Sequence, residues 1–156
     1  AERRRLRVVA RRLLLPRRQL GATHHEPVHL VGAVGEAERA LPGVIKGIEE
    51  AGHGDVDVIV RMSGCPNNCS RPRSAELGII GHGKDRFHVY IGGDYMGTRL
   101  CELFAENVSS AGLAPLISTL FDHWKRERRE GERFGDWSAR IGAAKLKERL
   151  QAAEAK

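Results

Sequence analysis

The sequence predicts an α+β fold, a mixed sheet with flanking helices, and three patterns support this prediction. Apolar residues at helical spacing mark residues 36–51 and 113–124. Apolar residues that alternate with polar ones, or follow one another in short runs, mark strands at 55–64, 75–81 and 86–93. With 156 residues, of which 41% are hydrophobic, the chain is long enough for one domain with a buried core.

The first predicted helix covers residues 36–51 and ends at a glycine. Its apolar residues share one helical face: Ala37, Leu41, Val44, Ile45 and Ile48. Pro42 lies near the first turns of this range. The next segment, 55–64, alternates valines with polar residues until Gly64 ends the run. We therefore expect a helix followed by a strand.

Residues 64–74 read GCPNNCSRPRS and are predicted to form a loop. The segment is rich in turn-forming residues and has neither a helical nor a strand periodicity. The strands 75–81 and 86–93 follow, separated by a short turn-prone segment. We expect these strands to form a hairpin packed beside the cysteine loop.

Two further helices are expected near the end of the chain. The stripe at 113–124 has Ser109 or Ser110 as its candidate N-cap and Gly131 as its stop. Residues 143–156 are strong helix formers with only a weak apolar stripe. This last helix is therefore predicted to be exposed.

The net charge of +6 is concentrated at the start of the chain. Residues 1–20 contain eight arginines and one glutamate, whereas the remainder has 18 basic and 19 acidic residues. A basic surface for nucleic acid is thus no property of the predicted domain. Residues 1–35 show no periodic core pattern, and we expect a solvated, disordered or non-native leader there. Arg11 and Arg12 interrupt its apolar run, which argues against a secretory signal.

The cysteine content and the hydropathy of the sequence indicate the cellular compartment that we expect for the protein. Three cysteines, Cys65, Cys69 and Cys101, are too few and too unevenly spaced for a disulfide framework. No apolar run approaches the roughly 20 residues that a membrane-spanning helix needs. We expect a soluble, cytoplasmic protein without a membrane partner.

The most informative motif is CPNNC, in which Cys65 and Cys69 are three residues apart on a predicted turn. This spacing excludes the C-x-x-C of thioredoxin-like centres and of zinc knuckles. Thiolates are the usual ligands of iron–sulfur clusters, and a tight turn directs backbone N–H groups at the sulfur atoms. The spacing by itself is equally consistent with two buried thiols on a loop.

Four blocks of sequence occur in order between residues 36 and 138. They are EAERALPGVI, RMSGCPNNCSRPRSAELGIIG, DRFHVYIGGDYMGTRL and KRERREGERFGDW. Together they resemble the C-terminal region of the siroheme-containing sulfite and nitrite reductases, most closely the sulfite-reducing members. The resemblance implies that residues 36–138 are part of a siroheme-binding domain and that 139–156 form an exposed helical tail. It also implies six-electron reduction of sulfite to sulfide, by an enzyme of which this chain is an incomplete C-terminal fragment.

The resemblance implies two cofactors, a siroheme and a 4Fe-4S cluster. The family holds its cluster with a C-x5-C pair and a C-x3-C pair, and Cys65 and Cys69 match the second pair. Cys69 is then implied to bridge the cluster and the siroheme iron, while Cys65 binds the cluster only. Asn67 matches a family position near the cofactor, and Arg71 matches an arginine suited to a siroheme carboxylate. A solvated arginine is equally consistent with the sequence at Arg71.

The chain departs from the family where the first cysteine pair is expected. Counting back from EAERALPGVI, that pair falls at about residues 24 and 30, where this chain has His24 and Leu30. Leucine offers no donor atom, so the chain cannot supply four thiolates. A divergent leader explains this departure, and so does our preferred hypothesis that the first thirty-odd residues were read in a wrong frame or joined wrongly. Translation of the other reading frames tests the hypothesis.

Other side chains are expected to have structural roles. Cys101 matches no ligand position and is expected to be a small buried residue. The glycine-rich segment 92–99 lacks both phosphate-binding patterns and is predicted to be a turn. His82 and His88 flank the hairpin and are expected to be surface or core residues. No catalytic residue is expected beyond Cys69, because the family's anion-binding arginines and lysines come from earlier segments.

Sulfite is the expected substrate, with a ferredoxin or an NADPH-dependent flavoprotein as electron donor and no nucleic-acid partner. Three alternatives remain open. One is a nitrite reductase, which uses the same cofactors. The second is a nucleic-acid-binding protein that uses the arginines of residues 1–20. The third is a zinc module formed by His24, His25, His29, Cys65 and Cys69.

Overall fold

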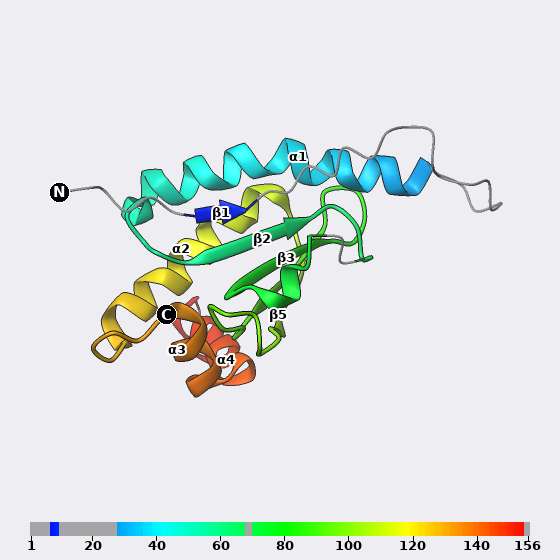
Figure 1. Ribbon diagram of the computed structural model, residues 1–156. Helices are drawn as coiled ribbons and strands as arrows, with labels where there is room; N and C mark the ends of the chain where they lie inside the picture. Colours follow the sequence, from blue (N-terminus) through cyan, green and yellow to red (C-terminus); the bar gives the residue numbers. More distant parts are fainter. Residues whose placement is uncertain (1–6, 10–27, 68–69, 155–156) are drawn as a thin grey trace.

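The computed structural model describes residues 7–9, 28–67 and 70–154 (Figure 1). In chain order, the elements are β1 (Arg7–Val9), α1 (Val28–Ile48), the π-helical turn η1 (Glu49–His53), β2 (Ile59–Ser63), the 3-10 turn η2 (Pro72–Ser74), β3 (Leu77–Gly81), β4 (Phe87–Ile91), β5 (Glu102–Val108), α2 (Ser110–Glu127), α3 (Phe134–Ile141) and α4 (Ala143–Glu154).

The described strands form one five-stranded sheet in the order β1-β2-β3-β4-β5. β1, β2 and β3 are parallel neighbours, whereas β4 runs antiparallel to both β3 and β5 (Figure 1). The sheet is therefore mixed and has flanking helices, which confirms the predicted α+β fold. The predicted hairpin is the β3–β4 pair, in which Leu77 pairs with Ile91 and Gly81 with Phe87.

Helix α1 is longer than the sequence indicated. It begins at Val28, eight residues before the predicted start at 36, and the rest of the predicted range forms η1. Pro42 consequently lies well inside the helix rather than in its first turns, and it is exposed. Gly52 has φ of 84°, a conformation that glycine adopts without steric cost, and it ends the helical path as predicted.

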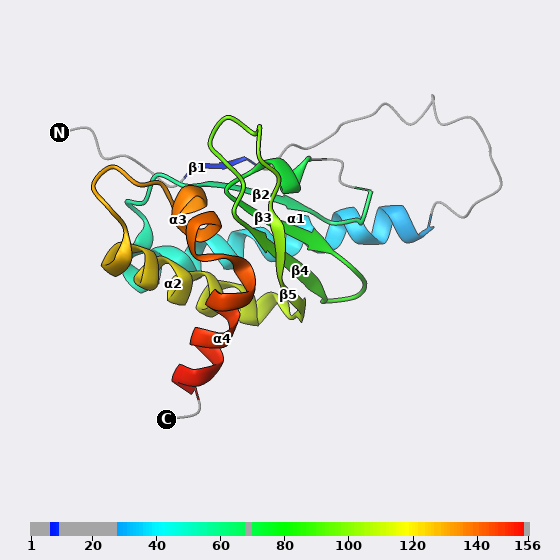
Figure 2. The same ribbon diagram turned by 90° about the horizontal axis from the view of Figure 1, so that it is seen from below.

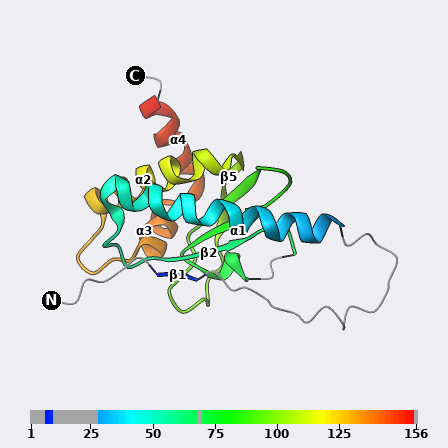
Figure 3. The same cartoon turned by 90° about the horizontal axis from the view of Figure 1, so that it is seen from above.

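Helices α1 and α2 lie side by side over one face of the sheet (Figures 2 and 3). They approach closely where small residues meet: a Cβ atom built on Gly47 would lie 2.6 Å from the Cβ of Ala114. Helix α2 contains the predicted stripe, and its N-cap is Ser109, whose Oγ accepts a hydrogen bond from Gly112 N at 3.2 Å. None of the described helices is long and apolar enough to cross a membrane.

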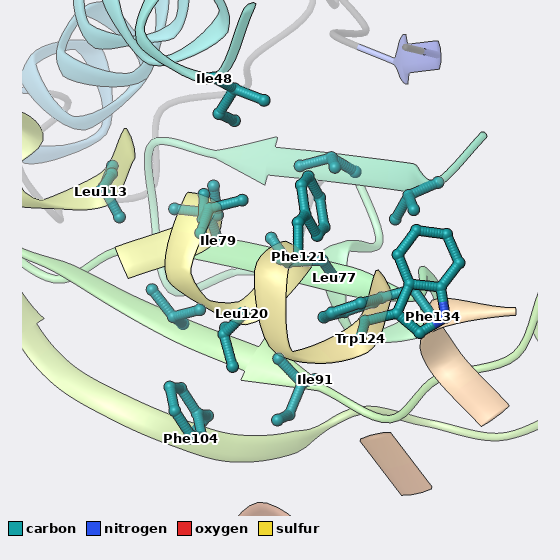
Figure 4. Close-up of a cluster of buried hydrophobic side chains, with 14 of the residues drawn as sticks. Ile48, Leu77, Ile79, Ile91, Phe104, Leu113, Leu120, Phe121, Trp124 and Phe134 are labelled. Carbon is teal, nitrogen blue, oxygen red and sulfur yellow. The ribbon is translucent and has the colours of Figure 1, made fainter. Parts of the chain in front are cut away.

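The hydrophobic core fills the space between the sheet and these helices (Figure 4). Leu113, Leu120 and Phe121 of α2 are fully buried against strand residues such as Leu77 and Ile79. Each such side chain contributes about 1.5–3 kcal/mol on burial. An aromatic cluster continues the core toward α3. Its rings make edge-to-face contacts, except that the Phe134 and Trp137 rings are tilted at 43°. Its members are Phe121, Trp124, Phe134 and Trp137.

The strands β1 and β5 and the helix α3 were not predicted, and one helix is less exposed than expected. β5 and α3 have no clear periodic signal: β5 buries only Phe104, and α3 has eight residues. Helix α4 matches the expected final helix, but Leu146 is only 1% exposed and Leu150 8%. Its weak apolar stripe is therefore sufficient to dock it on the core.

The opposite face of the sheet is the one that the cysteine loop crosses, and we call it the loop face. Because side chains alternate along a strand, the residues between the core positions of β2, β3 and β4 point to it. Two rows of paired residues lie on this face: Arg61, Gly78, Tyr90 and Leu103, and next to them Ser63, Ile80 and His88.

Candidate functional site

The cysteine loop, residues 64–76, connects the parallel strands β2 and β3. Its first residues are held against the end of β2. Ser63 Oγ donates to Cys65 O at 3.1 Å and lies 3.8 Å from Cys65 Sγ. Ser70 Oγ donates to Met62 O at 2.9 Å. Cys65 is 2% exposed, so its thiol occupies a fixed, buried position at the start of the loop.

The second part of the loop turns through η2. Arg71 has φ of 50° and ψ of 51°, a left-handed conformation that redirects the chain into the 3-10 turn. Ser74 Oγ donates to Arg71 O at 3.0 Å and accepts from Arg61 Nη1 at 2.9 Å. The loop then crosses β3 so closely that a Cβ atom built on Gly78 would lie 2.5 Å from Pro72 O.

The predicted site residues are distributed along this loop. Cys65 is buried at its start, whereas Asn67 and Arg71 are exposed. Cys69 lies outside the described residues, so the bridging role implied for it stays a prediction. Of the residues at the expected first pair, Leu30 lies in α1 and His24 is outside the described part of the chain.

Cys101 occupies a separate buried position beneath η2. Its Sγ donates to Ala75 O at 2.8 Å, and its backbone N donates to Arg73 O at 2.7 Å. Burial raises the pKa of the Cys101 thiol to about 11. The thiol is thus protonated at neutral pH, whereas a metal ligand must be a thiolate. The prediction that Cys101 is a small buried residue is confirmed.

The donor set for an iron–sulfur cluster is incomplete in this chain. A 4Fe-4S cluster is normally held by four thiolates, and the sequence contains three cysteines. Among the described residues there is no group of three or more histidine, cysteine or acidic side chains placed to hold a metal ion. Cys65 fits the role of one buried thiolate ligand, but the three cysteines of these 156 residues cannot supply all four thiolates.

A buried ion pair that the sequence reasoning missed fixes the end of the loop. Glu76 is 0% exposed, and its carboxylate accepts from Arg133 Nη2 at 2.7 Å and from Arg133 Nε at 3.1 Å. It also accepts from the backbone N of Ile59 and of Gly135. Arg133 donates further to Asp57 O at 2.8 Å. The only sequence signal is a charged residue, Glu76, directly before an apolar run.

The glycine-rich segment 92–99 is a structural turn, as predicted. Asp94 accepts from Thr98 Oγ1 at 2.6 Å and from Arg99 N at 2.7 Å, and these bonds lower the pKa of Asp94 to about 2. Arg99 Nε donates to Gly92 O at 2.6 Å, and Arg99 Nη2 reaches Asp136 at 2.7 Å. The basic group therefore closes the turn.

The cysteine loop lies within the part of the chain that matches a known protein family. Residues 58–156 match the family model described as the nitrite and sulphite reductase 4Fe-4S domain. The sulfite reductase (NADPH) hemoprotein beta-component of a Methylobacterium species is 46% identical over 114 residues, which cover 70% of this chain and 19% of that protein. The proteins of the same name from Shewanella woodyi and Lysinibacillus sphaericus are 41% and 40% identical, over 71% and 70% of this chain and 20% of each relative. The chain thus spans about a fifth of the length of the curated relatives that it matches.

Proposed function

The chain belongs to the nitrite and sulphite reductase 4Fe-4S domain family, and from this premise we propose that it is part of an enzyme that reduces sulfite to sulfide. The relatives favour sulfite over nitrite, since each is named a sulfite reductase. Because the chain spans about a fifth of their length, we propose that it is inactive by itself.

Cys65 and Cys69 are proposed as two of the four thiolate ligands of a 4Fe-4S cluster, with Cys69 also bound to the iron of a siroheme. The observation that carries this assignment is the fixed, buried thiol of Cys65 on a loop that is hydrogen-bonded to the end of β2. The bound cofactors would supply electrons and a site for the sulfur atom of sulfite.

The chain's own residues have supporting roles in this proposal. Ser63 Oγ lies 3.8 Å from Cys65 Sγ. A turn of its hydroxyl proton from Cys65 O to a ligating sulfur would raise the reduction potential of a cluster. The exposed guanidinium of Arg71 is available for a carboxylate of the siroheme. Asn67, exposed at the tip of the loop, is a further polar contact for the cofactor.

NADPH, acting through a separate flavoprotein, is proposed as the source of electrons. The relatives carry NADPH in their printed names. A ferredoxin donor is the alternative, and assays of the assembled enzyme with each reductant distinguish the two.

The ligand assignment is tested in a chimera in which this chain replaces the matching segment of the Methylobacterium protein. Each variant is reconstituted anaerobically, and its iron and acid-labile sulfide are counted alongside the absorption spectrum. The single variants Cys65→Ser and Cys69→Ser should each lose the cluster, because each removes one thiolate of the set. Cys101→Ala is the matched control and should retain iron and sulfide.

Retention of full iron and sulfide by Cys65→Ser would contradict the assignment. The same reconstitution of the 156-residue chain alone should yield little or no cluster, because two ligands are lacking. A complete cluster on the isolated chain would refute the proposal that ligands come from outside it.

A further inference from the structure

A hollow of about 370 Å³ opens on the loop face, directly beside the cysteine loop. It is lined by Pro66, Arg73, Ile80, His82, His88 and Tyr90. Ile80, His88 and Tyr90 form its floor from neighbouring strands, since Ile80 pairs with His88 in the β3–β4 ladder. Pro66 and Arg73 come from the loop, and His82 comes from the hairpin turn. The volume lies at the lower end of the range for small-molecule sites, about 300–1,000 Å³.

Two polar side chains with few protein partners line this hollow, the exposed Arg73 and the half-buried His88. The Arg73 guanidinium has five N–H donors, and its one hydrogen bond within the described residues is a long one, from Nη2 to Cys101 O at 3.5 Å. The His88 Nε2 atom is buried and has no hydrogen-bond partner there either. Such a buried ring nitrogen costs free energy until a partner is provided.

The cationic and aromatic side chains of the hollow also contact one another in pairs. The Arg73 guanidinium carbon lies 5.5 Å from the centroid of the Tyr90 ring. The rings of His82 and His88 lie 4.3 Å apart with an interplanar angle of 40°. These contacts hold the cation and the imidazoles around one space, which lowers the cost of ordering them on binding.

The six lining residues include no carboxylate, and Pro66 and Ile80 add an apolar wall. We propose that the hollow binds a small ligand that carries a phosphate-type or carboxylate oxyanion on an apolar body. Arg73 binds the oxyanion, His88 donates or accepts through Nε2, and the apolar body packs on Ile80 and Pro66. Among the described residues that line the hollow, Pro66 directly follows Cys65, and none is a cysteine.

Phenyl phosphate is the test ligand. Inorganic phosphate, which has only the oxyanion, and phenol, which has only the apolar ring and a hydroxyl, are the comparison ligands. The isolated full chain is titrated at constant ionic strength while backbone and imidazole NMR shifts are followed. Phenyl phosphate should give saturable shifts at His88, Tyr90 and the Arg73 side chain, with tighter binding than inorganic phosphate. Phenol should give no saturable shift, since it lacks the oxyanion.

Arg73→Met should weaken phenyl phosphate binding about tenfold or more, as expected for the loss of a charged hydrogen bond. Arg86→Met, at an exposed arginine of the same hairpin that does not line the hollow, is the matched control and should bind as the parent does. His88→Leu is the second variant and should also weaken binding. Dispersed amide signals confirm that each variant is folded.

Three results would overturn the proposal. One is the absence of saturable shifts with both phosphates. The second is equal weakening by Arg73→Met and Arg86→Met, which indicates a diffuse charge effect. The third is equal affinity for phenyl phosphate and inorganic phosphate, which removes the apolar part of the site.

Discussion

Replacement of Glu76 by glutamine should lower the free energy of unfolding by about 3 kcal/mol. The carboxylate is 0% exposed and joins three parts of the fold. It accepts from Ile59 N at the start of β2, from Gly135 N in α3, and from two nitrogens of Arg133 directly before α3. Glutamine keeps the shape but presents an amide donor where an acceptor is needed.

The magnitude follows from the surroundings of the pair. Breaking a buried ion pair by removing one charge costs about 3–5 kcal/mol. The lower end applies here, because the Arg133 side chain is 26% exposed and keeps its contact with Asp57. Against a total stability of roughly 5–15 kcal/mol, the loss is large. The melting temperature should fall by about 6–12 °C.

Urea unfolding followed by circular dichroism measures this change. Glu50→Gln is the matched control: Glu50 pairs with Lys46 at 3.5 Å on the surface of the helix, and its side chain is 66% exposed. The control should change the unfolding free energy by less than about 0.5 kcal/mol. A loss below about 1 kcal/mol for Glu76→Gln, or an equal loss in the control, would refute the assigned role.

Three further predictions concern other buried groups. Burial, and then the nearby Lys125, lowers the pKa of His53 below its usual 6.5. As the pH drops below 6.5, the unfolded chain therefore takes up the proton first, and the stability falls by at most about 1.4 kcal/mol per pH unit. His53→Leu should reduce this slope in pH-dependent unfolding, and an unchanged slope would count against the prediction. Gly78→Ala, whose Cβ would lie 2.5 Å from a carbonyl oxygen, should cost about 1–3 kcal/mol in thermal unfolding. By contrast, Gly43→Ala in α1, with no atom within 4 Å, should add about 0.5–1 kcal/mol, and the reverse order would refute the packing argument. Because burial raises the pKa of Cys101 to about 11, iodoacetamide at pH 8 should label it only after unfolding, which mass spectrometry detects; equal labelling of the native chain would contradict this.

The fold was predictable where one face of an element carries a strong pattern. Helix α2 and the β3–β4 hairpin follow from such patterns. Strand β5 was not predictable, because Phe104 is its only buried side chain. An edge strand with a single buried residue shows no alternation of apolar and polar residues. The short helix α3 depends on contacts distant in sequence, of which the Glu76–Arg133 pair is the clearest.

The site was predictable only as a motif. The spacing of Cys65 and Cys69 and the surrounding blocks indicated the family, and the family model matches residues 58–156. The supporting contacts were not predictable, because Arg61 and Ser74 meet only after β2 and β3 have paired. Sequence spacing cannot show such a contact.

The pairing of two parallel strands explains why the cysteine loop has its present form. Parallel neighbours require a connection that returns over the sheet, and this one crosses β3 where Gly78 leaves room for Pro72 O. The crossing is fixed at one end by Ser63 and at the other by Glu76. These bonds hold the backbone on both sides of the loop that carries the first thiol. A ligand held in this way loses little conformational freedom on binding iron, so loss of a cysteine should remove the cluster without removing the fold.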